Sequence, residues 1–180
     1  ALAQSRLRHR QAQNLMEALL AYVRRHRNTF PQNICDSDGT PLLSWRVELL
    51  PYLNSPTAQK AFRSLKRNEP WNSPHNAEVL SKLPPRLFAT HAATPDGCCD
   101  IVAVQGTEVG FLPSAPDRGP LRIADFGDGL SQTALLVELA PERAVPWAEP
   151  VDLDWNPEST AAIGSADAAA FLAIMGDMRV

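Results

Sequence analysis

Residues 36–40 read Asp-Ser-Asp-Gly-Thr, which is how many calcium-binding loops begin. A complete loop of this kind also needs further oxygen ligands and a bidentate glutamate at its twelfth position. That position is Val47 in this chain, so the pattern favours a tight Asp-Gly turn over a calcium site. Asp128 and Gly129, in the Gly-Asp-Gly sequence at residues 127–129, lead to the same interpretation. We predict no metal ligands and no cofactor, and leave only a structural calcium ion open.

The chain has three cysteines, Cys35, Cys98 and Cys99, too few for a disulfide framework. Because adjacent cysteines rarely bond to each other, the bridge that an oxidising compartment would allow joins Cys35 to Cys98 or to Cys99. His91, Cys98, Cys99 and Asp100 lack the regular spacing of a zinc site. The cysteines therefore predict at most one disulfide and no zinc.

Recognisable enzyme motifs are missing. A catalytic thiol would pair Cys98 or Cys99 with His75 or His91, but nothing in the sequence brings these side chains together. There is no Gly-x-Ser-x-Gly elbow, no Walker-type phosphate loop and no Gly-x-Gly-x-x-Gly. We assign no catalytic residue and predict that the protein is not an enzyme. An unrecognised metal-dependent or thiol enzyme is the last of three hypotheses.

Arginines are concentrated at the start of the chain. Residues 1–27 carry six arginines and one glutamate, a formal charge of +5, whereas the remaining residues carry 11 basic and 19 acidic groups, a charge of −8. Such a basic segment can contact an anionic partner, such as lipid headgroups or nucleic acid, or form a solvated helix surface. The candidate partner or assembly face consists of Arg6, Arg8, Arg10, Arg24, Arg25 and Arg27.

Two tryptophans, Trp71 and Trp147, each follow a proline. An exposed tryptophan in this setting can form a recognition surface. We favour the alternative that each fills the core beneath a long loop.

The apolar residues of the first segment fall at intervals of three and four, which predicts one long amphipathic helix. They are Ala12, Leu15, Met16, Leu19, Tyr22 and Val23. We expect the helix to end near His26 or Arg27, before Asn28 and Pro31, and its first turns to extend into solvent.

Three hydroxyl–proline pairs follow, Thr40-Pro41, Ser55-Pro56 and Ser73-Pro74. Each places a good N-cap before a proline at the first helical position. They predict short helices within residues 42–50, 58–65 and 77–83, stopped by the prolines at positions 51 and 84–85.

Strands are predicted at residues 100–105 and 133–139, with a brief extended segment at 121–123. Residues 169–175 and 178–180 read as a terminal hairpin around Gly176-Asp177. The expected fold is α+β, with the long helix packed on an antiparallel sheet, several short helices and long loops rich in the 16 prolines. Residues 1–27 would form a stalk helix and residues 28–180 a globular head.

Residues 69–76, Glu-Pro-Trp-Asn-Ser-Pro-His-Asn, resemble a signature of a large bacterial family of pilin-like domains of unknown function, often described as type II secretion pseudopilin-G-like proteins. Other stretches resemble further blocks of that family in the same order: residues 14–15, 30–31, 38–47, 50–53, 123–125, 128–133 and 145–150. The family positions that we expect to be structural are Trp45, Trp71, Ser73, Pro74, His75, Asn76, Asp128, Gly129 and Trp147.

This resemblance implies a non-enzymatic, pilin-like subunit of a bacterial envelope or secretion assembly. An apolar segment preceding Ala1 would anchor it in the inner membrane, with the head in the periplasm or outside the cell. Its partners would be other pilin-like subunits or secretion-machinery proteins, and not nucleic acid. The alternative is a soluble binding module whose basic helix engages an anionic partner.

The end of the chain departs from the family pattern. Relatives often end in a histidine, nine residues, then Asp-Gly. Ser165 and Met175 stand here in place of that histidine and aspartate. We therefore expect the turn at Gly176-Asp177 to survive as structure only.

Overall fold

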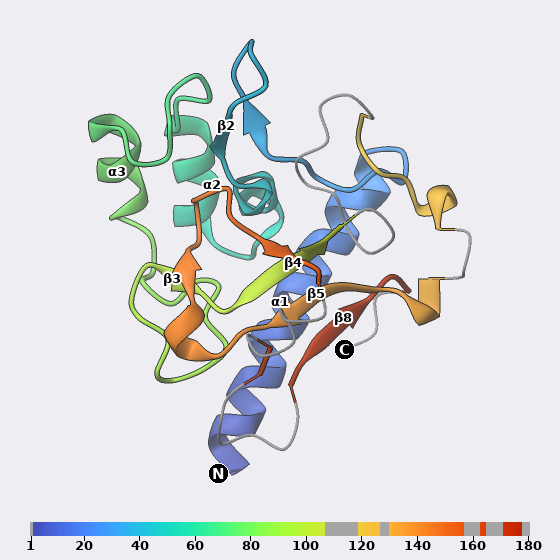
Figure 1. Cartoon of the computed structure of the whole chain (residues 1–180). Helices are drawn as coiled ribbons and strands as arrows, with labels where there is room; N and C mark the ends of the chain where they lie inside the picture. The colour runs from blue at the N-terminus through green and yellow to red at the C-terminus, as the bar shows by residue number, and fades with distance from the viewer. Residues whose placement is uncertain (1, 107–118, 127–129, 157–162, 165–170, 178–180) are drawn as a thin grey trace.

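The computed structural model describes residues 2–106, 119–126, 130–156, 163–164 and 171–177. Within them the chain combines helices with small sheets, which confirms the predicted α+β class. A long helix comes first and short helices follow, while the strands of the main sheet come later in the chain (Figure 1).

The first element is the predicted long helix, α1, Leu2–Arg25. It ends there because Arg27 and Asn28 adopt φ values of 56° and 61°, a left-handed conformation that cannot continue a right-handed helix. Its first turns project beyond the rest of the molecule (Figure 1). Its fully buried side chains lie at the predicted intervals and are those of Ala12, Leu15, Ala18, Leu19 and Val23.

The main sheet has four strands in the order β7-β4-β5-β8. The strands at residues 100–105 and 133–139 are confirmed as β4 and β5, but the sheet is mixed and not purely antiparallel. β5 runs antiparallel to β4 and β8, whereas β7 runs parallel to β4 because residues 145–156 return along the free edge of β4. The bounds are Ile101–Gln105 for β4, Ala134–Glu138 for β5, Leu153–Asp154 for β7 and Ala173–Met175 for β8.

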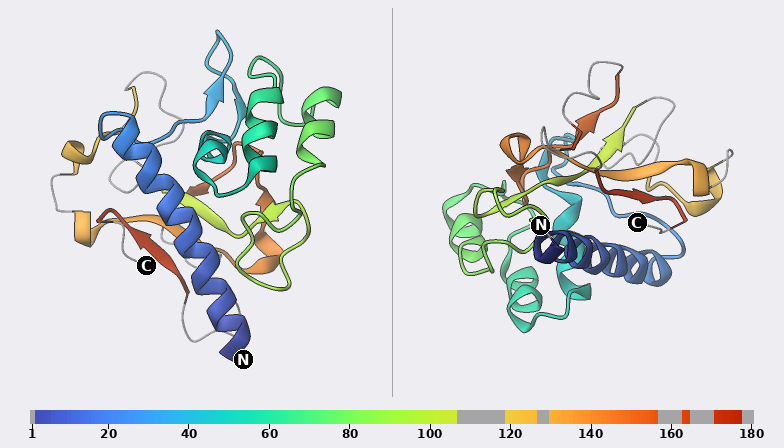
Figure 2. Two further views of the ribbon diagram at one scale, coloured as in Figure 1. Left: turned by 180° about the vertical axis from the view of Figure 1, so that it is seen from behind. Right: turned by 90° about the horizontal axis from the view of Figure 1, so that it is seen from below.

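α1 lies across one face of this sheet (Figure 2, right). Side chains on that face join the main core, including Ile101, Ala103, Leu136 and Ile174. A second, smaller core on the opposite face contains Val102, Val104, Val137 and Leu139. The pairing of β5 with β8 shifts register between Ala134 and Leu136, so the consecutive Leu135 and Leu136 both reach the main core.

Two of the three predicted hydroxyl caps begin helices as expected. These helices are α2, Pro56–Ser64, and α3, Pro74–Leu80. Ser55 and Ser73 each accept a hydrogen bond from the backbone N–H three residues later, which satisfies one donor at the start of the helix. α3 already ends at Leu80, so the prolines at 84–85 follow it without stopping it.

The helix predicted after Thr40-Pro41 begins later. Residues 36–40 form the turn of a hairpin between β1, Ile34–Cys35, and β2, Pro41–Leu43, so Thr40 caps no helix. The helix that follows is the 3₁₀-helix η1, Trp45–Tyr52, capped by Ser44, and it includes Pro51 in its last turn.

Two further expectations need correction. Residues 121–123 form no strand: a single bridge joins Arg122 to Thr29, and the Asp125 carboxylate accepts a hydrogen bond from the Arg122 N–H, closing the 3₁₀ turn of η2, Ile123–Asp125. The last strand, β8, pairs with β5, while residues 178–180 lie outside the described residues.

The remaining elements are short. β3 pairs antiparallel with β6, and two more 3₁₀ turns, η3 and η4, flank β5. No helix in the described part of the chain is both long enough and apolar enough to cross a membrane. The bounds are Cys98–Cys99 for β3, Val145–Pro146 for β6, Leu130–Gln132 for η3 and Pro141–Arg143 for η4.

Candidate functional site

An ion pair fixes the first half of α1 to the sheet. Arg8 lies one turn before Ala12 and continues the buried stripe of the helix. It meets Glu138 on β5, whose side chain is only 3% exposed, and its Nε donates to Glu138 Oε1 at 3.0 Å while its Nη2 contacts Oε2. The hydrogen bond to Glu138 raises the pKa of the Arg8 guanidinium. Arg8 therefore docks the helix onto the head of its own chain.

A second buried carboxylate, that of Asp100, lies close to this ion pair. Its oxygens accept hydrogen bonds from the backbone N–H groups of Thr90 and His91, both at 2.8 Å, and from the hydroxyl of Thr94. The Thr90 hydroxyl lies 2.9 Å from Asp100 Oδ1 and 2.8 Å from Glu138 Oε1. Because a hydroxyl carries one hydrogen, it donates to one carboxylate at a time. The loop at residues 90–94 is thus built around Asp100 and coupled to α1.

We expect Arg8→Gln to lower the free energy of unfolding by about 1.5–3 kcal/mol, since it leaves the buried Glu138 without its cation. Chemical denaturation measures the change. Arg10→Gln is the matched control, because Arg10 is exposed on the same helix and we expect a change within about 0.5 kcal/mol. Equal effects of the two substitutions would contradict a docking role for Arg8.

The opposite side of α1 carries an exposed ridge, which we call the outer ridge. No described element crosses it in the view from behind the sheet (Figure 2, left). Its members follow the helical repeat, which explains why they share one face. They are Arg6, Arg10, Gln13, Glu17 and Arg24. Of the six predicted arginines, Arg8 is paired within the chain, and Arg25 and Arg27 gather at the C-terminal end of the helix.

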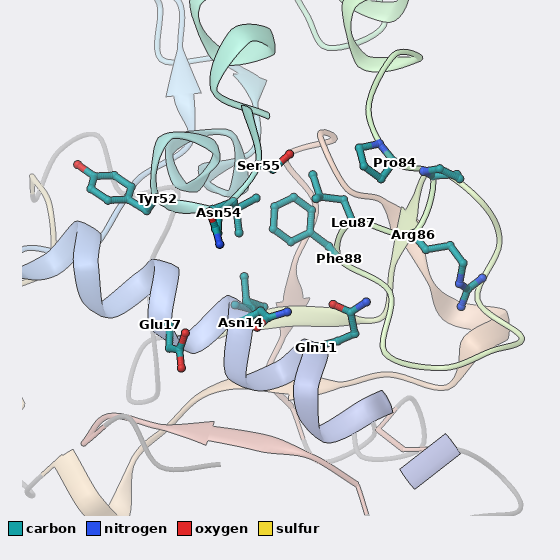
Figure 3. Close-up of a pocket in the computed structure, with 13 residues that line it drawn as sticks. Gln11, Asn14, Glu17, Tyr52, Asn54, Ser55, Pro84, Arg86, Leu87 and Phe88 are labelled. Carbon is teal, nitrogen blue, oxygen red and sulfur yellow. The ribbon is translucent and has the colours of Figure 1, made fainter. Parts of the chain in front are cut away.

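A groove of about 690 Å³ runs beside the outer ridge (Figure 3). One wall comes from α1, through Gln11, Asn14, Leu15 and Glu17. The other comes from residues 52–55 and 84–88, and includes the apolar side chains of Leu53, Leu87 and Phe88. The Ser55 hydroxyl is already bonded as the cap of α2. The lining combines these apolar side chains with the polar side chains of Gln11, Asn14 and Glu17.

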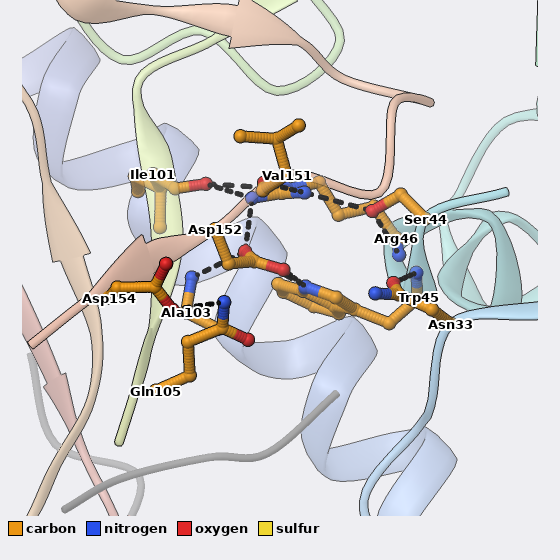
Figure 4. Close-up of polar contacts among 10 residues, drawn as sticks. All are labelled: Asn33, Ser44, Trp45, Arg46, Ile101, Ala103, Gln105, Val151, Asp152 and Asp154. Atoms are coloured by element: carbon orange, nitrogen blue, oxygen red, sulfur yellow. Dashed lines mark hydrogen bonds and ion pairs between the residues drawn. The ribbon is translucent and has the colours of Figure 1, made fainter. Parts of the chain in front are cut away.

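A fully buried ion pair joins η1 to the segment that precedes β7 (Figure 4). The Arg46 guanidinium donates to Asp152 Oδ1 at 2.8 Å, and neither side chain is more than 1% exposed. Asp152 also accepts from the backbone N–H of Ala103 at 2.8 Å and from Trp45 Nε1 at 3.1 Å. Burial raises the pKa of the Asp152 carboxyl, and Arg46 with these N–H donors acts in the opposite direction.

Arg46 also makes hydrogen bonds to three other groups. Its guanidinium donates to the Ser44 hydroxyl at 2.8 Å and to the carbonyls of Ile101 and Val151 at 3.2 and 3.5 Å. The pair therefore holds η1, β4 and the start of β7 together. This arrangement is structural, because every polar atom of the pair already has a partner within the protein.

The conspicuous segment at residues 69–76 also forms a structural unit. Asn76 is fully buried, and its Oδ1 accepts from the backbone N–H of Lys66 at 2.9 Å. Its Nδ2 donates to the carbonyls of Lys66, Glu69 and Pro70 at 3.0–3.1 Å. His75 bonds the carbonyl of Ser64 at 2.8 Å. The segment therefore ties the first turn of α3 to the end of α2.

The other positions expected to be structural lie in or beside the core. Trp45 and Trp147 are buried, with Trp147 tilted against Phe88 at a centroid distance of 5.1 Å. Trp71 is half-buried against the main core, and its backbone N–H donates a hydrogen bond to the carbonyl of Leu42. This packing matches the expectation that Trp71 and Trp147 fill space beneath loops. Asp128, Gly129 and Ser165 lie outside the described residues, and Met175 is the last residue of β8.

All three cysteines are free thiols, so the predicted bridge from Cys35 to Cys98 or Cys99 is not formed in this structure. Cys35 lies on β1 and Cys98 on β3. Burial raises the pKa of all three thiols, and that of Cys99 reaches about 12. A nucleophilic thiol needs the opposite shift.

The residues that the sequence analysis weighed as metal ligands and set aside have other roles. Asp36 Oδ1 accepts hydrogen bonds from the backbone N–H groups of Asp38 and Thr40, at 3.0 and 2.8 Å, which makes the predicted tight turn. His91 Nδ1 accepts a hydrogen bond from the N–H of Ala93. Among the residues that the structure describes, no three His, Cys, Asp or Glu side chains are grouped as a metal site.

The buried Cys99 predicts a loss of stability at alkaline pH. Its thiol ionises near pH 8.5 in the unfolded chain but only near 12 in the folded one, so its contribution is complete below about pH 8.5 and declines as the pH approaches 12. Tyr22, whose pKa burial also raises to about 12, acts in the same direction. Denaturant titrations from pH 7 to 11 should show a shallower decline for Cys99→Ala. Parallel curves for the two proteins would contradict this prediction.

Neither of the two buried ion pairs, Arg8 with Glu138 and Arg46 with Asp152, was predicted from the sequence. One signal was available for Arg8, which stands four residues before Ala12 on the apolar stripe. No such signal existed for Arg46, because its partner is 106 positions away.

The comparison with known families found a match to part of the chain. Residues 9–95 match the model of a family described as a protein of unknown function (DUF1559). The comparisons with curated proteins and with solved structures found no match. The matched region runs from α1 through η1, α2 and α3 and ends before β3, so it contains Arg46 and the segment at residues 69–76 but no strand of the main sheet.

Proposed function

We propose that this chain is a non-enzymatic, pilin-like subunit of a bacterial envelope or secretion assembly, in which α1 packs against neighbouring subunits. The observation that carries the proposal is the two-sided character of α1. One stripe of the helix is buried against the sheet, while the outer ridge stays exposed from Arg6 to Arg24. A helix of 24 residues, about 36 Å long, offers a continuous contact surface.

The charge distribution supports the same arrangement. The outer ridge carries three arginines and one glutamate, whereas residues 28–180 carry a formal charge of −8. Opposite charges on two surfaces of one subunit favour association of the helix of one copy with the head of another. The groove beside α1 provides a recess for a side chain or loop of the neighbour.

Anchoring completes the proposal. An apolar segment of about 20 residues before α1 would hold the subunit in the inner membrane, with the head in the periplasm or outside the cell. Recovering the native protein from fractionated cells and measuring its intact mass and N-terminal sequence tests this. We expect a membrane-bound protein that carries such a segment. A protein recovered only from the soluble fraction, and beginning near Ala1, would exclude the anchored subunit.

A soluble module that engages an anionic partner through its basic helix is the second candidate. The favouring observation is that Arg6, Arg10 and Arg24 share the exposed ridge. Against it, Arg8 is paired with Glu138 and unavailable. The two candidates are separated by washing membranes at high ionic strength: a soluble module held through arginines is released, whereas a subunit anchored by an apolar segment stays in the membrane fraction.

A further inference from the structure

The C-terminal end of α1 borders a basic hollow of about 490 Å³. It is lined by Arg25, His26, Arg27, Thr29 and Arg122. The three arginines come from two segments far apart in the sequence, and all three are exposed. The basic hollow therefore gathers three positive charges around one recess.

The backbone holds these arginines in place. Arg27 and the next residue, Asn28, both adopt the left-handed conformation, which is uncommon for residues other than glycine. Backbone hydrogen bonds of 2.8 and 3.0 Å tie residues 28–30 to residues 121–123 and stabilise this turn. Arg122 forms the bridge at the centre of that contact. The left-handed backbone at Arg27 and Asn28 carries a conformational energy cost, and the turn that it forms brings Arg27 to the same recess as Arg122.

In the described part of the chain these arginines form no ion pair, and the neighbouring Asp125 carboxylate accepts a hydrogen bond from the backbone N–H of Arg122. Arg8, Arg46 and Arg67 each pair with a carboxylate, but no ion pair joins Arg25, Arg27 or Arg122 to a described acid. The helix dipole explains an arginine in the last turn of α1, such as Arg25. It does not explain Arg122, which belongs to another segment. The basic hollow has the charge and the fork-shaped donors of an anion site.

The walls of the hollow are fixed by contacts of their own. The His26 ring stacks on the Tyr22 ring with 3.9 Å between the ring centroids, and His26 Nε2 lies 3.0 Å from the Tyr52 hydroxyl oxygen. The Thr29 hydroxyl donates to the His26 carbonyl. No hydrogen bond within the described part of the chain engages the three guanidinium groups, so they are the donors that a ligand in the hollow would meet.

We propose that the basic hollow binds a phosphate group, carried either by a small phosphate ester or by a lipid headgroup. A single carboxylate would need one guanidinium, whereas three guanidinium groups match the higher charge and several oxygens of a phosphate. This inference does not depend on the pilin-like assignment, since it rests only on the recess and its three arginines.

Titration of the isotope-labelled protein with inorganic phosphate, followed by backbone amide NMR at constant ionic strength, tests the proposal. We expect saturable shifts confined to residues 25–29 and 122, with a dissociation constant on the order of 1 mM or tighter. In the double variant Arg27→Gln, Arg122→Gln we expect binding at least about tenfold weaker. Arg63→Gln, an exposed arginine on α2 outside the hollow, should bind as the unmodified protein does.

A second arm identifies the source of the phosphate. Vesicles containing phosphatidic acid are compared with vesicles of phosphatidylcholine alone. Saturable binding of free phosphate assigns the site to a small ester. Binding only to phosphatidic acid vesicles, lost in the double variant, assigns it to a headgroup. Absence of both, or equal binding by the double variant, would overturn the proposal.

Discussion

Replacing Asp152 with alanine should lower the free energy of unfolding by about 3–5 kcal/mol, because it leaves the Arg46 charge buried without a partner. The backbone N–H of Ala103 and the Trp45 indole would lose their acceptor as well. For a domain of this size the midpoint of thermal unfolding should fall by about 6–20 °C. Calorimetry and denaturant unfolding measure both quantities.

Matched variants separate charge from packing. Asp154→Ala removes an exposed carboxylate two residues away, one that accepts a hydrogen bond from the Gln105 amide, and should change stability by less than about 0.5 kcal/mol. Asp152→Asn keeps the volume but removes the charge, so it should cost nearly as much as alanine. The double variant Arg46→Met, Asp152→Leu should be more stable than either single one. Near-neutral effects of both Asp152 substitutions would show that the pair does not stabilise the fold.

A second large effect is expected for Asn76→Ala, about 2–3 kcal/mol of destabilisation. The substitution removes the partner of the Lys66 N–H and of three carbonyl groups around a fully buried amide. Hydrogen exchange should show the effect locally, as faster exchange of the Lys66 amide. The free energy of unfolding and the exchange rate of the Lys66 amide together distinguish loss of the Asn76 hydrogen bonds from general destabilisation.

The control for Asn76 lies in the same segment. Asn72 is exposed, so Asn72→Ala should leave both stability and Lys66 exchange nearly unchanged. Similar effects of the two substitutions would mean that residues 69–76 have no specific structural role. That result would also remove the structural explanation for a motif inside the region matched by the family model.

Local signals were sufficient to predict the long helix, the caps of α2 and α3 and the two central strands. Each depends on residues near one another in sequence, such as the apolar stripe of α1 or Ser73 before Pro74. The prediction of a helix directly after Thr40-Pro41 was wrong because residues 36–40 form the turn between β1 and β2, and Pro41 belongs to β2. The parallel pairing of β7 with β4 was not predictable for a related reason: Val104 and Leu153 meet across a long connection.

The site was less predictable than the fold. The arginines of the first helix were singled out by number alone, and their roles differ because the surroundings differ. Arg8 meets a buried carboxylate, Arg10 faces solvent, and Arg27 occupies a left-handed turn beside Arg122. Each of these roles depends on a segment more than 90 residues away or on the opposite face of the helix, which composition does not encode.

Photo-cross-linking from the outer ridge tests the central claim most directly. A benzophenone side chain is placed at Gln13, in the middle of the ridge, in the native protein in its own cells, with a control at the exposed Ser81 after α3. We predict cross-links from Gln13 to a second copy of this chain or to another pilin-like subunit in the membrane fraction, and none from Ser81. A protein that remains un-cross-linked at Gln13, or that links equally from both positions, would contradict assembly through α1.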